Sequence, residues 1–316
     1  MMIDMIPRGD KQILYAIWPV LAILLGALVV AFVISRIRKA QGKKQGNFVW
    51  IASWLLLISS LGIFAYHSNV LGIKNLWAKQ QVASQKKVVK KQAQKSVERL
   101  AVEKMVMRDQ DTQDAFTKIG FVAIPDVSIL LPIYNDAYSV TGLNLGADYA
   151  NKSADDPDGE KEPVMGQGNY GLAAHNFNDG KTGFSALQEK LDENAPYLVD
   201  GQTGTSDWLK NKPVYLANAD GIYEYRITEQ TTMVPTDVAV LNQTPNAQLT
   251  IISCLFPNIN YRIITHADFV KHYSWQSAPK QMVGYFNLQV QNTNARADWF
   301  NPGTEEGANG DRGGAK

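Results

Sequence analysis

Two long hydrophobic runs near the N-terminus constrain this chain more than any other feature of its sequence. Residues 13–35 contain no charged side chain, and crossing a bilayer takes about 20 apolar residues. Residues 48–66 form a second run, whose apolar character persists to Ile73 and whose Trp50, Trp54 and Tyr66 are placed as interfacial aromatic residues often are. The sequence therefore predicts two transmembrane helices within residues 13–73, after a short tail of residues 1–12. A buried helical hairpin is the alternative.

The basic residues around these runs predict which side of the membrane each part occupies. The loop of residues 36–47 carries five basic side chains, Arg36, Arg38, Lys39, Lys43 and Lys44. The positive-inside rule places such a loop in the cytoplasm. Six lysines between residues 74 and 91 argue for the opposite orientation, but they are less dense. We therefore expect a multi-pass protein of the cell membrane whose remaining residues lie outside the cell.

Charge is divided unequally along the chain. Residues 1–109 hold 17 Lys/Arg and 5 Asp/Glu, a net of +12, and the remainder holds 14 and 25, a net of −11. Binding to phosphate backbones needs clustered Lys and Arg, so the acidic part argues against nucleic acid as a partner. Residues 74–119 lack Pro and Gly and predict a polar, solvated helical stalk.

From Gly120 onward the sequence is typical of a β-rich domain. Several short runs of branched and aromatic residues indicate strands; these are residues 121–125, 127–134, 169–177, 214–217, 223–232, 249–254 and 261–265. Asn218–Gly221 is a hairpin turn signal, and Phe184–Leu191 predicts a short helix. Such a pattern favours a barrel or sandwich over residues 120–290. The Gly-rich, charged residues that follow, 291–316, predict a flexible tail.

Three side chains in this domain suggest covalent catalysis. Cys254, the only cysteine of the chain, ends the apolar run 250–254. Arg262 follows eight residues later, so an antiparallel return would bring its guanidinium near the thiol, where it can stabilise an oxyanion. His175 ends another strand-like run, and a Cys with a nearby His is the minimal pair of nucleophile and base. Spacing alone does not establish that the two meet, and a lone Cys is most often a small buried side chain.

The segments around these residues resemble the sortase family. Met165–His175 resembles the stretch around the catalytic histidine of sortases. Residues 250–254 resemble the signature Thr-Leu-x-Thr-Cys, with Ile in place of Leu and Ser in place of Thr, and Arg262 matches the arginine of the family. Weaker similarities lie at the start of the barrel (Ile124-Pro125 and Leu131–Ile133) and in the helix Phe184–Leu187. The resemblance covers about residues 120–275.

The resemblance implies an all-β fold, a closed barrel of about eight strands with short helices, and a cysteine transpeptidase of the class A, housekeeping type. In this reading Cys254 attacks the Thr–Gly bond of an LPxTG-type signal, His175 is the general acid and base, and Arg262 orients the substrate. Substrate contacts are expected from Ala174, Ser253 and Thr250. The implied partners are secreted proteins with such a C-terminal signal and an amino group of a peptidoglycan precursor, in a Gram-positive bacterium.

No cofactor is expected, and one cysteine excludes a Cys-based metal cluster. Some class A sortases bind calcium, and an acidic loop offers oxygen ligands of the kind that calcium prefers: Asp155, Asp156, Asp158, Glu160 and Glu162. A solvated loop is the reading that we favour. His67, His266 and His272 are expected to be surface or packing residues.

Two other functions use the same residues. A cysteine peptidase would release the cleaved signal to water and would ignore an added amine. A membrane-tethered binding domain on the same barrel would carry out no turnover, but it would be expected to lose at least one of Cys254, His175 and Arg262. A transporter or channel is disfavoured by the small number of predicted spans.

Overall fold

The computed structural model describes residues 98–108 and 116–295, together with residues 36, 37, 41, 54, 57, 58, 80, 86, 87, 307 and 308. The chain divides into two compact units, Met1–Lys74 and Asn75–Lys316. Nearly all of the predicted spans, and most of the predicted stalk, lie outside the described residues. Within the described part, none of the helices has the length and apolar character that membrane crossing requires.

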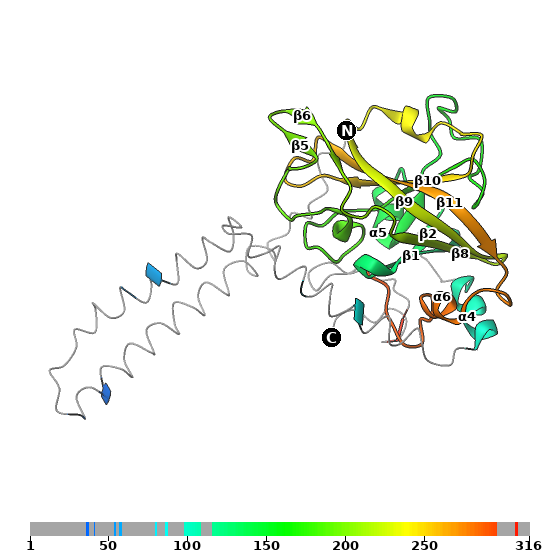
Figure 1. The fold of residues 1–316 in the computed structure, drawn as a ribbon, viewed down its shortest axis with the longest axis horizontal. Coiled ribbons are helices and arrows are strands. Elements are labelled where there is room, and N and C mark those ends of the chain that lie inside the picture. The colour runs from blue at the N-terminus through cyan, green and yellow to red at the C-terminus, as the bar shows by residue number, and fades with distance from the viewer. Residues whose placement is uncertain are drawn as a thin grey trace. The chain divides into compact units, whose positions relative to one another are not determined.

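The described residues form a sheet that closes into a barrel (Figure 1). Its strands follow the order β11-β10-β4-β3-β2-β1-β8-β9-β7, and an additional pairing of β11 with β9 joins eight of the nine strands in a ring. The bounds are β1 Lys118–Ile124, β2 Ile129–Tyr134, β3 Ala147–Tyr149, β4 Asn169–Ala173, β7 Thr205–Ser206, β8 Pro213–Asn218, β9 Gly221–Met233, β10 Gln248–Cys254 and β11 Arg262–Tyr273. The predicted closed barrel of about eight strands is confirmed.

Two pairs of neighbouring strands are parallel, β2 with β3 and β4 with β10, and the other pairs are antiparallel. A separate hairpin joins β5 (Leu198–Val199) to β6 (Gln202–Thr203). The expected hairpin turn is present between β8 and β9, where the Asn218 side chain accepts a hydrogen bond from the Asp220 N–H. The two long strands β9 and β11 pair along most of their length and complete the ring.

Short helices connect the strands: η2 Pro125–Val127, α5 Val140–Leu145, η3 Ser185–Leu187, η4 Val238–Leu241 and α6 Lys280–Gly284. The helix predicted over residues 184–191 is shorter than expected, because Gln188 has extended backbone angles and ends η3. The single strand-like run 127–134 also begins later than expected. Pro125 has a fixed φ and no N–H, so it starts the turn η2 before β2 begins at Ile129.

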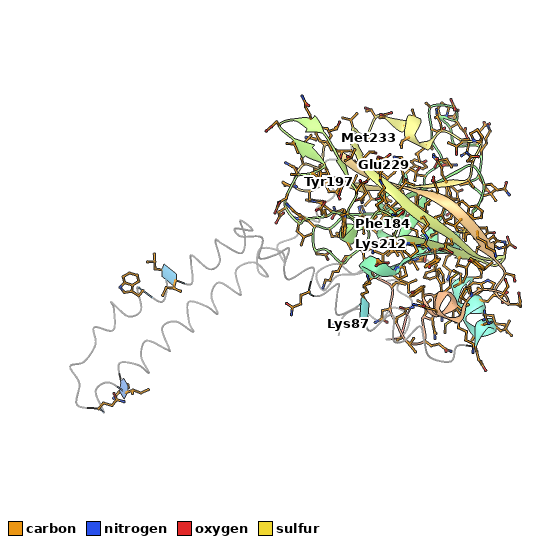
Figure 2. The ribbon with its side chains drawn as sticks, in the orientation of Figure 1. Lys87, Phe184, Tyr197, Lys212, Glu229 and Met233 are labelled. Carbon is orange, nitrogen blue, oxygen red and sulfur yellow. The ribbon has the colours of Figure 1, made fainter. Side chains whose placement is uncertain are left out.

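The barrel interior is a cluster of buried apolar side chains that alternate along the strands. It includes Val122, Leu131, Leu172, Phe184 and Ile251. Figure 2 labels Phe184 and also Tyr197, which belongs to a smaller cluster with Leu255 and Ile263. A second large cluster lies outside the ring and joins β1 and β8 to the helices α4 (Arg99–Val106) and α6.

The helix α4 differs from the solvated stalk that the sequence predicted. Val102 and Val106 are almost fully buried, and they pack in the outer cluster with Trp275 and Val283. Arg99 donates to the backbone carbonyl of Trp275 at 2.8 Å. The helix α4 can pack against the domain because Val102 and Val106 lie four residues apart and therefore fall on one helix face. The predicted stalk boundary at residue 119 was also wrong, since β1 begins at Lys118.

Residues 291–295, at the start of the predicted flexible tail, also depart from that prediction. Ala295 is 4% exposed and packs in the barrel cluster. The Asn294 side chain accepts from the Leu130 N–H at 2.8 Å and donates to the carbonyls of Lys181 and Gly183 at 2.8 and 2.9 Å. Its backbone makes two further bonds, to Leu130 and Gly183. Hydrogen bonds of Asn294 therefore connect residues 291–295 to β2 and to the loop after β4.

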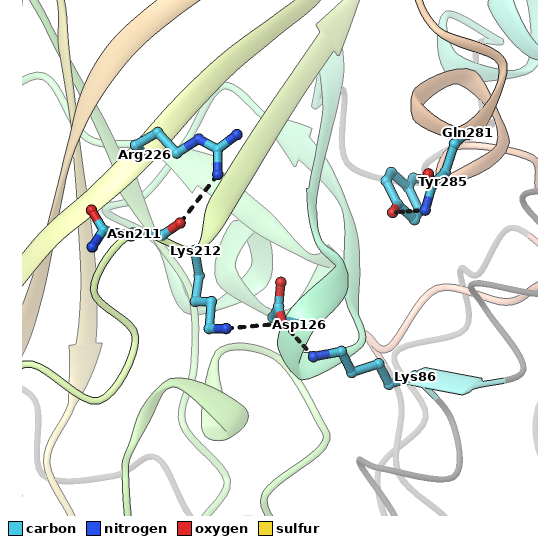
Figure 3. A network of polar contacts seen from close by, with 7 residues as sticks. All are labelled: Lys86, Asp126, Asn211, Lys212, Arg226, Gln281 and Tyr285. Atoms are coloured by element: carbon cyan, nitrogen blue, oxygen red, sulfur yellow. Dashed lines mark hydrogen bonds and ion pairs between the residues drawn. The ribbon is translucent and has the colours of Figure 1, made fainter.

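Asp126, on η2, joins two other segments of the same unit (Figure 3). It accepts from the ammonium group of Lys86 and lies 3.6 Å from that of Lys212. The Lys86 side chain is partly exposed, and pairs of this kind contribute about 0–1 kcal/mol each. The contact shows that one lysine of the predicted stalk meets the β-rich domain rather than solvent alone.

We expect Asn294→Ala to destabilise the fold by about 1–3 kcal/mol, because the Leu130 N–H and two carbonyls lose their partner. Urea unfolding followed by tryptophan fluorescence would measure the change. Gln289→Ala is the matched control, since that side chain is exposed, and it should change the free energy of unfolding by less than about 0.5 kcal/mol. Equal midpoints for the two variants would contradict this role of Asn294.

Candidate active site

The site lies where β10 ends and β11 begins. Cys254 is the last residue of β10, and Arg262 is the first residue of β11. The antiparallel register places the two residues directly opposite each other, and paired residues point to the same face of a sheet. The loop between them therefore returns the chain as the spacing of eight residues predicted, and it brings the guanidinium to the side of the thiol.

His175 reaches the same place through the parallel pairing of β4 with β10. In that pairing Ala173 lies beside Ile252, so His175 and Cys254 each lie two residues further along. The ladder continues past Ala173, because the Ala174 N–H donates to the Ile252 carbonyl at 3.3 Å. Side chains alternate along a strand, so His175 and Cys254 share a face. Leu172 and Ile251 point into the barrel cluster, which places this face on the outside of the ring.

A buried amide network holds the backbone beyond both residues. The Asn176 side chain donates to the Cys254 carbonyl at 2.8 Å and to Gln188 Oε1 at 2.9 Å. Gln188 in turn accepts from the Phe256 N–H at 3.0 Å and donates to the Phe256 carbonyl at 2.6 Å. Asn176 and Gln188 are about 5% and 4% exposed. Because every bond lies in a poorly solvated region, the network fixes the chain at Cys254 and in the residues that follow it.

The imidazole of His175 lies between Asn144 and Phe177. Its Nε2 is 3.1 Å from Asn144 Oδ1, which can only accept, so in this contact Nε2 carries the proton. The ring centroid is 5.3 Å from that of Phe177. Burial lowers the pKa of His175 to about 4, since desolvation disfavours the charged form. The resting imidazole is therefore neutral at neutral pH.

Burial has the corresponding effect on the thiol. It raises the pKa of Cys254 above its usual range, while the positive charge of Arg262 opposes the rise. Arg262 itself donates from Nη1 to the carbonyls of Ile259 and Tyr261, at 2.8 and 3.1 Å. These bonds hold the guanidinium in the loop after Cys254. The resting pair is thus a neutral thiol and a neutral imidazole, next to a fixed cation.

The three predicted substrate contacts are all buried. Thr250 is fully buried, and its hydroxyl donates to Asn169 Oδ1 at 2.7 Å, which ties β10 to β4. This gives the side chain a structural contact and no exposed surface for a substrate. Ala174 and Ser253 are 6% and 3% exposed, and both point to the inner side of the ring. The Ser253 hydroxyl makes no hydrogen bond among the described residues. Roles in substrate binding stay predictions for these residues.

The acidic loop is organised by its own backbone. Asp156 accepts from the N–H groups of Glu160 and Lys161 at 3.1 and 2.9 Å, and these bonds lower the pKa of its carboxyl. Among the described residues no three His, Cys, Asp or Glu side chains converge as metal ligands. The sequence favoured a solvated loop over a calcium site, and that preference stays a prediction.

The other described histidines lie away from the site. His266 is on β11, where Nε2 is 3.3 Å from the Thr231 hydroxyl. His272 stacks on Tyr223 with ring centroids 4.4 Å apart. Both are packing residues in this structure. Sequence reasoning missed Asn144, Asn176 and Gln188, because an isolated amide residue carries no pattern that separates it from any other polar side chain.

Comparisons with known proteins found similarity to sortases. The sortase domain family matches residues 122–270. Sortase A of Streptococcus agalactiae serotype III (strain NEM316) is 32% identical over 177 residues, which cover 56% of this chain and 62% of that protein. Sortase A of Listeria monocytogenes serovar 1/2a (strain ATCC BAA-679 / EGD-e) is 27% identical over 141 residues, 45% of this chain and 51% of that protein.

This chain therefore spans between about half and two thirds of the length of these relatives. The chain is also similar to a crystal structure of Listeria monocytogenes sortase A, at 25% identity and a TM-score of 0.41. The match covers 54% of this chain and 97% of that structure. The matched segment 122–270 contains all three candidate catalytic residues. Over these residues the chain is similar to the sortase domain family.

Proposed function

We propose that the protein is a cysteine transpeptidase of the sortase A type, which cleaves an LPxTG-type sorting signal between Thr and Gly and joins the cleaved protein to an amine of a cell-wall precursor. The observation that carries the proposal is the placement of His175, Cys254 and Arg262 on one face of the sheet, just after β4, at the end of β10 and at the start of β11. A nucleophile, a base and a cation in this order support acyl transfer.

In the first half of the reaction, His175 takes the proton of the Cys254 thiol, and the thiolate sulfur attacks the threonine carbonyl carbon. A carbon–sulfur bond forms, and the carbonyl oxygen becomes an oxyanion. The Thr–Gly carbon–nitrogen bond then breaks, and the glycine amine leaves with the proton from His175. The acyl group remains on Cys254 as a thioester, which conserves the bond energy for the second step.

In the second half, the acceptor amine attacks the thioester carbonyl and gives its proton to His175. The carbon–sulfur bond breaks, an amide forms, and the thiolate regains a proton. Burial favours the neutral forms of both Cys254 and His175, so the reactive ion pair is a minor species at rest. Arg262 lowers the energy of that species and of both oxyanions, because a fixed cation in a poorly solvated site is not screened.

The natural partners follow from the same proposal. Secreted proteins that end in an LPxTG-type signal supply the acyl group, and a peptidoglycan precursor supplies the amine. Both are found at the outer face of a cell membrane, which agrees with the two spans and the cytoplasmic basic loop that the sequence predicts within residues 13–73. We therefore propose a membrane-anchored enzyme whose barrel faces the cell wall of a Gram-positive bacterium.

We expect ligation rather than hydrolysis when the full chain is mixed with a quenched LPxTG-type peptide and oligoglycine. Mass spectrometry should detect a ligated peptide and a thioacyl adduct on Cys254, since the chain has no other thiol. Cleavage that ignores the amine would instead identify a peptidase. An absence of turnover over a panel of related motifs would favour a non-catalytic binding domain.

Cys254→Ala should abolish both products, with a loss of roughly 10³-fold or more in turnover, because no other described group can form the thioester. The free energy of unfolding should change by about 1 kcal/mol or less, since a partly buried sulfur is removed. Thermal unfolding would confirm that the variant is folded. Turnover that survives in a folded variant would rule out the mechanism.

Arg262→Ala should raise the pKa of Cys254 further, because the guanidinium opposes the effect of burial. The rate of Cys254 alkylation by iodoacetamide reports the thiolate fraction. When this rate is plotted against pH, its midpoint should lie at a higher pH in the variant than in the wild type. Turnover should fall by roughly 10²- to 10³-fold. Arg262→Lys keeps the charge but loses the planar donor fork. Compared with Arg262→Ala, its alkylation profile should therefore be closer to that of the wild type, while its turnover should remain low. An unchanged profile in the alanine variant would contradict the electrostatic role.

A further inference from the structure

A buried carboxyl outside the catalytic trio lies beside the site. Asp148, the central residue of β3, has no exposed surface. Its Oδ2 makes no hydrogen bond among the described residues. A buried carboxyl oxygen without a hydrogen-bond partner is costly, and each such atom in a native structure calls for an explanation. Neither the sequence motifs nor the catalytic trio accounts for it.

The strand register places Asp148 near His175 and Cys254 on the same face of the sheet. Asp148 pairs with Ala173 on β4, and Ala173 pairs with Ile252 on β10. His175 and Cys254 lie two residues further along these strands. The neighbours of Asp148 on β3, Ala147 and Tyr149, pack on the barrel cluster, so Asp148 points to the outer face, as His175 and Cys254 do. The carboxyl is therefore a diagonal neighbour of His175 on one sheet surface.

One contact links this carboxyl to the turn that begins α5. The Asp136 N–H donates to Asp148 Oδ1 at 3.4 Å. The Asp136 side chain accepts from the N–H groups of Tyr138 and Ser139 at 2.9 and 3.2 Å, and Ser139 caps the helix by accepting from the Gly142 N–H at 3.0 Å. The start of α5 is thus built on the turn that Asp148 holds.

The fit of α5 onto that turn is close. A Cβ on Gly142 would lie 2.2 Å from the Asp136 carbonyl oxygen, so only glycine permits the approach. At the other end of the helix, a Cβ on Gly146 would lie 2.6 Å from the Pro132 carbonyl oxygen. Between these two contacts α5 carries Asn144, whose Oδ1 is 3.1 Å from His175 Nε2. A shift of the turn would therefore move the partner of the catalytic imidazole.

We propose that Asp148 is a positioning residue of the active site. Its carboxyl accepts a hydrogen bond from the Asp136 turn, and that turn fixes the position of α5. The helix α5 in turn places Asn144 next to the ring of His175. The residue touches neither substrate nor reacting atoms in this arrangement. It acts through the backbone of Asp136 and the rigid helix. The inference rests on the proposed function only for its turnover measurements.

The protonation state of Asp148 supports this role. Burial raises the pKa of its carboxyl to about 8, an effect that the Asp136 N–H opposes and the Asp136 carboxylate reinforces. The titratable groups around it are Asp136 in the turn, Tyr134 beside it on β2 and His175 beyond β4, while α5 carries none. Below pH 8 the carboxyl is neutral and holds the turn without a buried charge. Above pH 8 its charge repels Asp136 and opposes thiolate formation at Cys254.

The test compares Asp148→Asn, Asp148→Ala and Asn144→Ala in the full chain. Asparagine keeps an oxygen acceptor for the Asp136 N–H and cannot ionise, whereas alanine removes the acceptor. Glu224→Gln is the matched control, because Glu224 is also a buried acid, about 6% exposed, but it pairs with Arg226. The readouts are kcat and KM on an LPxTG-type peptide and the pH profile of Cys254 alkylation, which needs no substrate.

We expect Asp148→Ala and Asn144→Ala to lower kcat roughly 10- to 100-fold with KM changed less than about 2-fold, since misplacement of a catalytic group by about 1 Å costs up to 10²-fold. Asp148→Asn should keep the kcat of the wild type at pH 7. Above pH 8 the wild type should react more slowly with iodoacetamide than Asp148→Asn. Glu224→Gln should follow the wild type throughout.

An alkylation profile that is the same in the wild type, Asp148→Asn and Asp148→Ala would overturn the proposal, as would an equal loss of kcat in Glu224→Gln. If Asp148→Ala does not fold, the comparison of the wild type with Asp148→Asn above pH 8 decides the matter. If the wild type itself turns over no peptide, the proposed function fails. The alkylation profiles still support or reject the role of Asp148 in that case, because they measure the thiol alone.

Discussion

The parallel pairing of β4 with β10 is the interaction on which the site depends. Parallel neighbours end at the same edge of a sheet, so His175 and Cys254, which are 79 positions apart in the chain, emerge side by side. The antiparallel return of β11 then sets Arg262 opposite Cys254. Because both strands lie within a closed ring, a register shift of one residue would turn Leu172 and Ile251 out of the core. The hydrophobic core thus holds the catalytic register.

The same burial that fixes the register also governs the chemistry. Desolvation favours the neutral forms of Cys254 and His175, and the nearby cation of Arg262 compensates in part. The Cys254 carbonyl and both polar backbone groups of Phe256 are bonded by the amide side chains of Asn176 and Gln188. Amide groups carry no charge, so they hold the loop without adding a buried ion to the site. The site combines a rigid neutral scaffold with one fixed positive charge.

Much of the barrel could be predicted from the sequence, because its strands are short apolar runs between turn residues. The hairpin at Asn218–Gly221 and the strand that ends at Cys254 are local features, and both are present. Segments whose packing depends on distant partners were misjudged. The sequence predicts a solvated helix over α4, whereas Trp275 and Val283, which are distant in the chain, pack against Val102 and Val106. Residues 291–295 looked flexible because the bonds of Asn294 are made to residues more than 100 positions away.

The sequence by itself determined which family the chain resembles and which residue is the candidate nucleophile, since the chain has one cysteine, at a strand end, within a segment that resembles the sortase signature. Only the tertiary structure decided what surrounds that nucleophile. Asn144 and Asp148 carry no local signal, and they reach the site through strand pairing and helix seating. The physical reason is that hydrophobic periodicity is a local property of the chain, whereas hydrogen-bond partners and desolvation depend on which residues the closed barrel brings together.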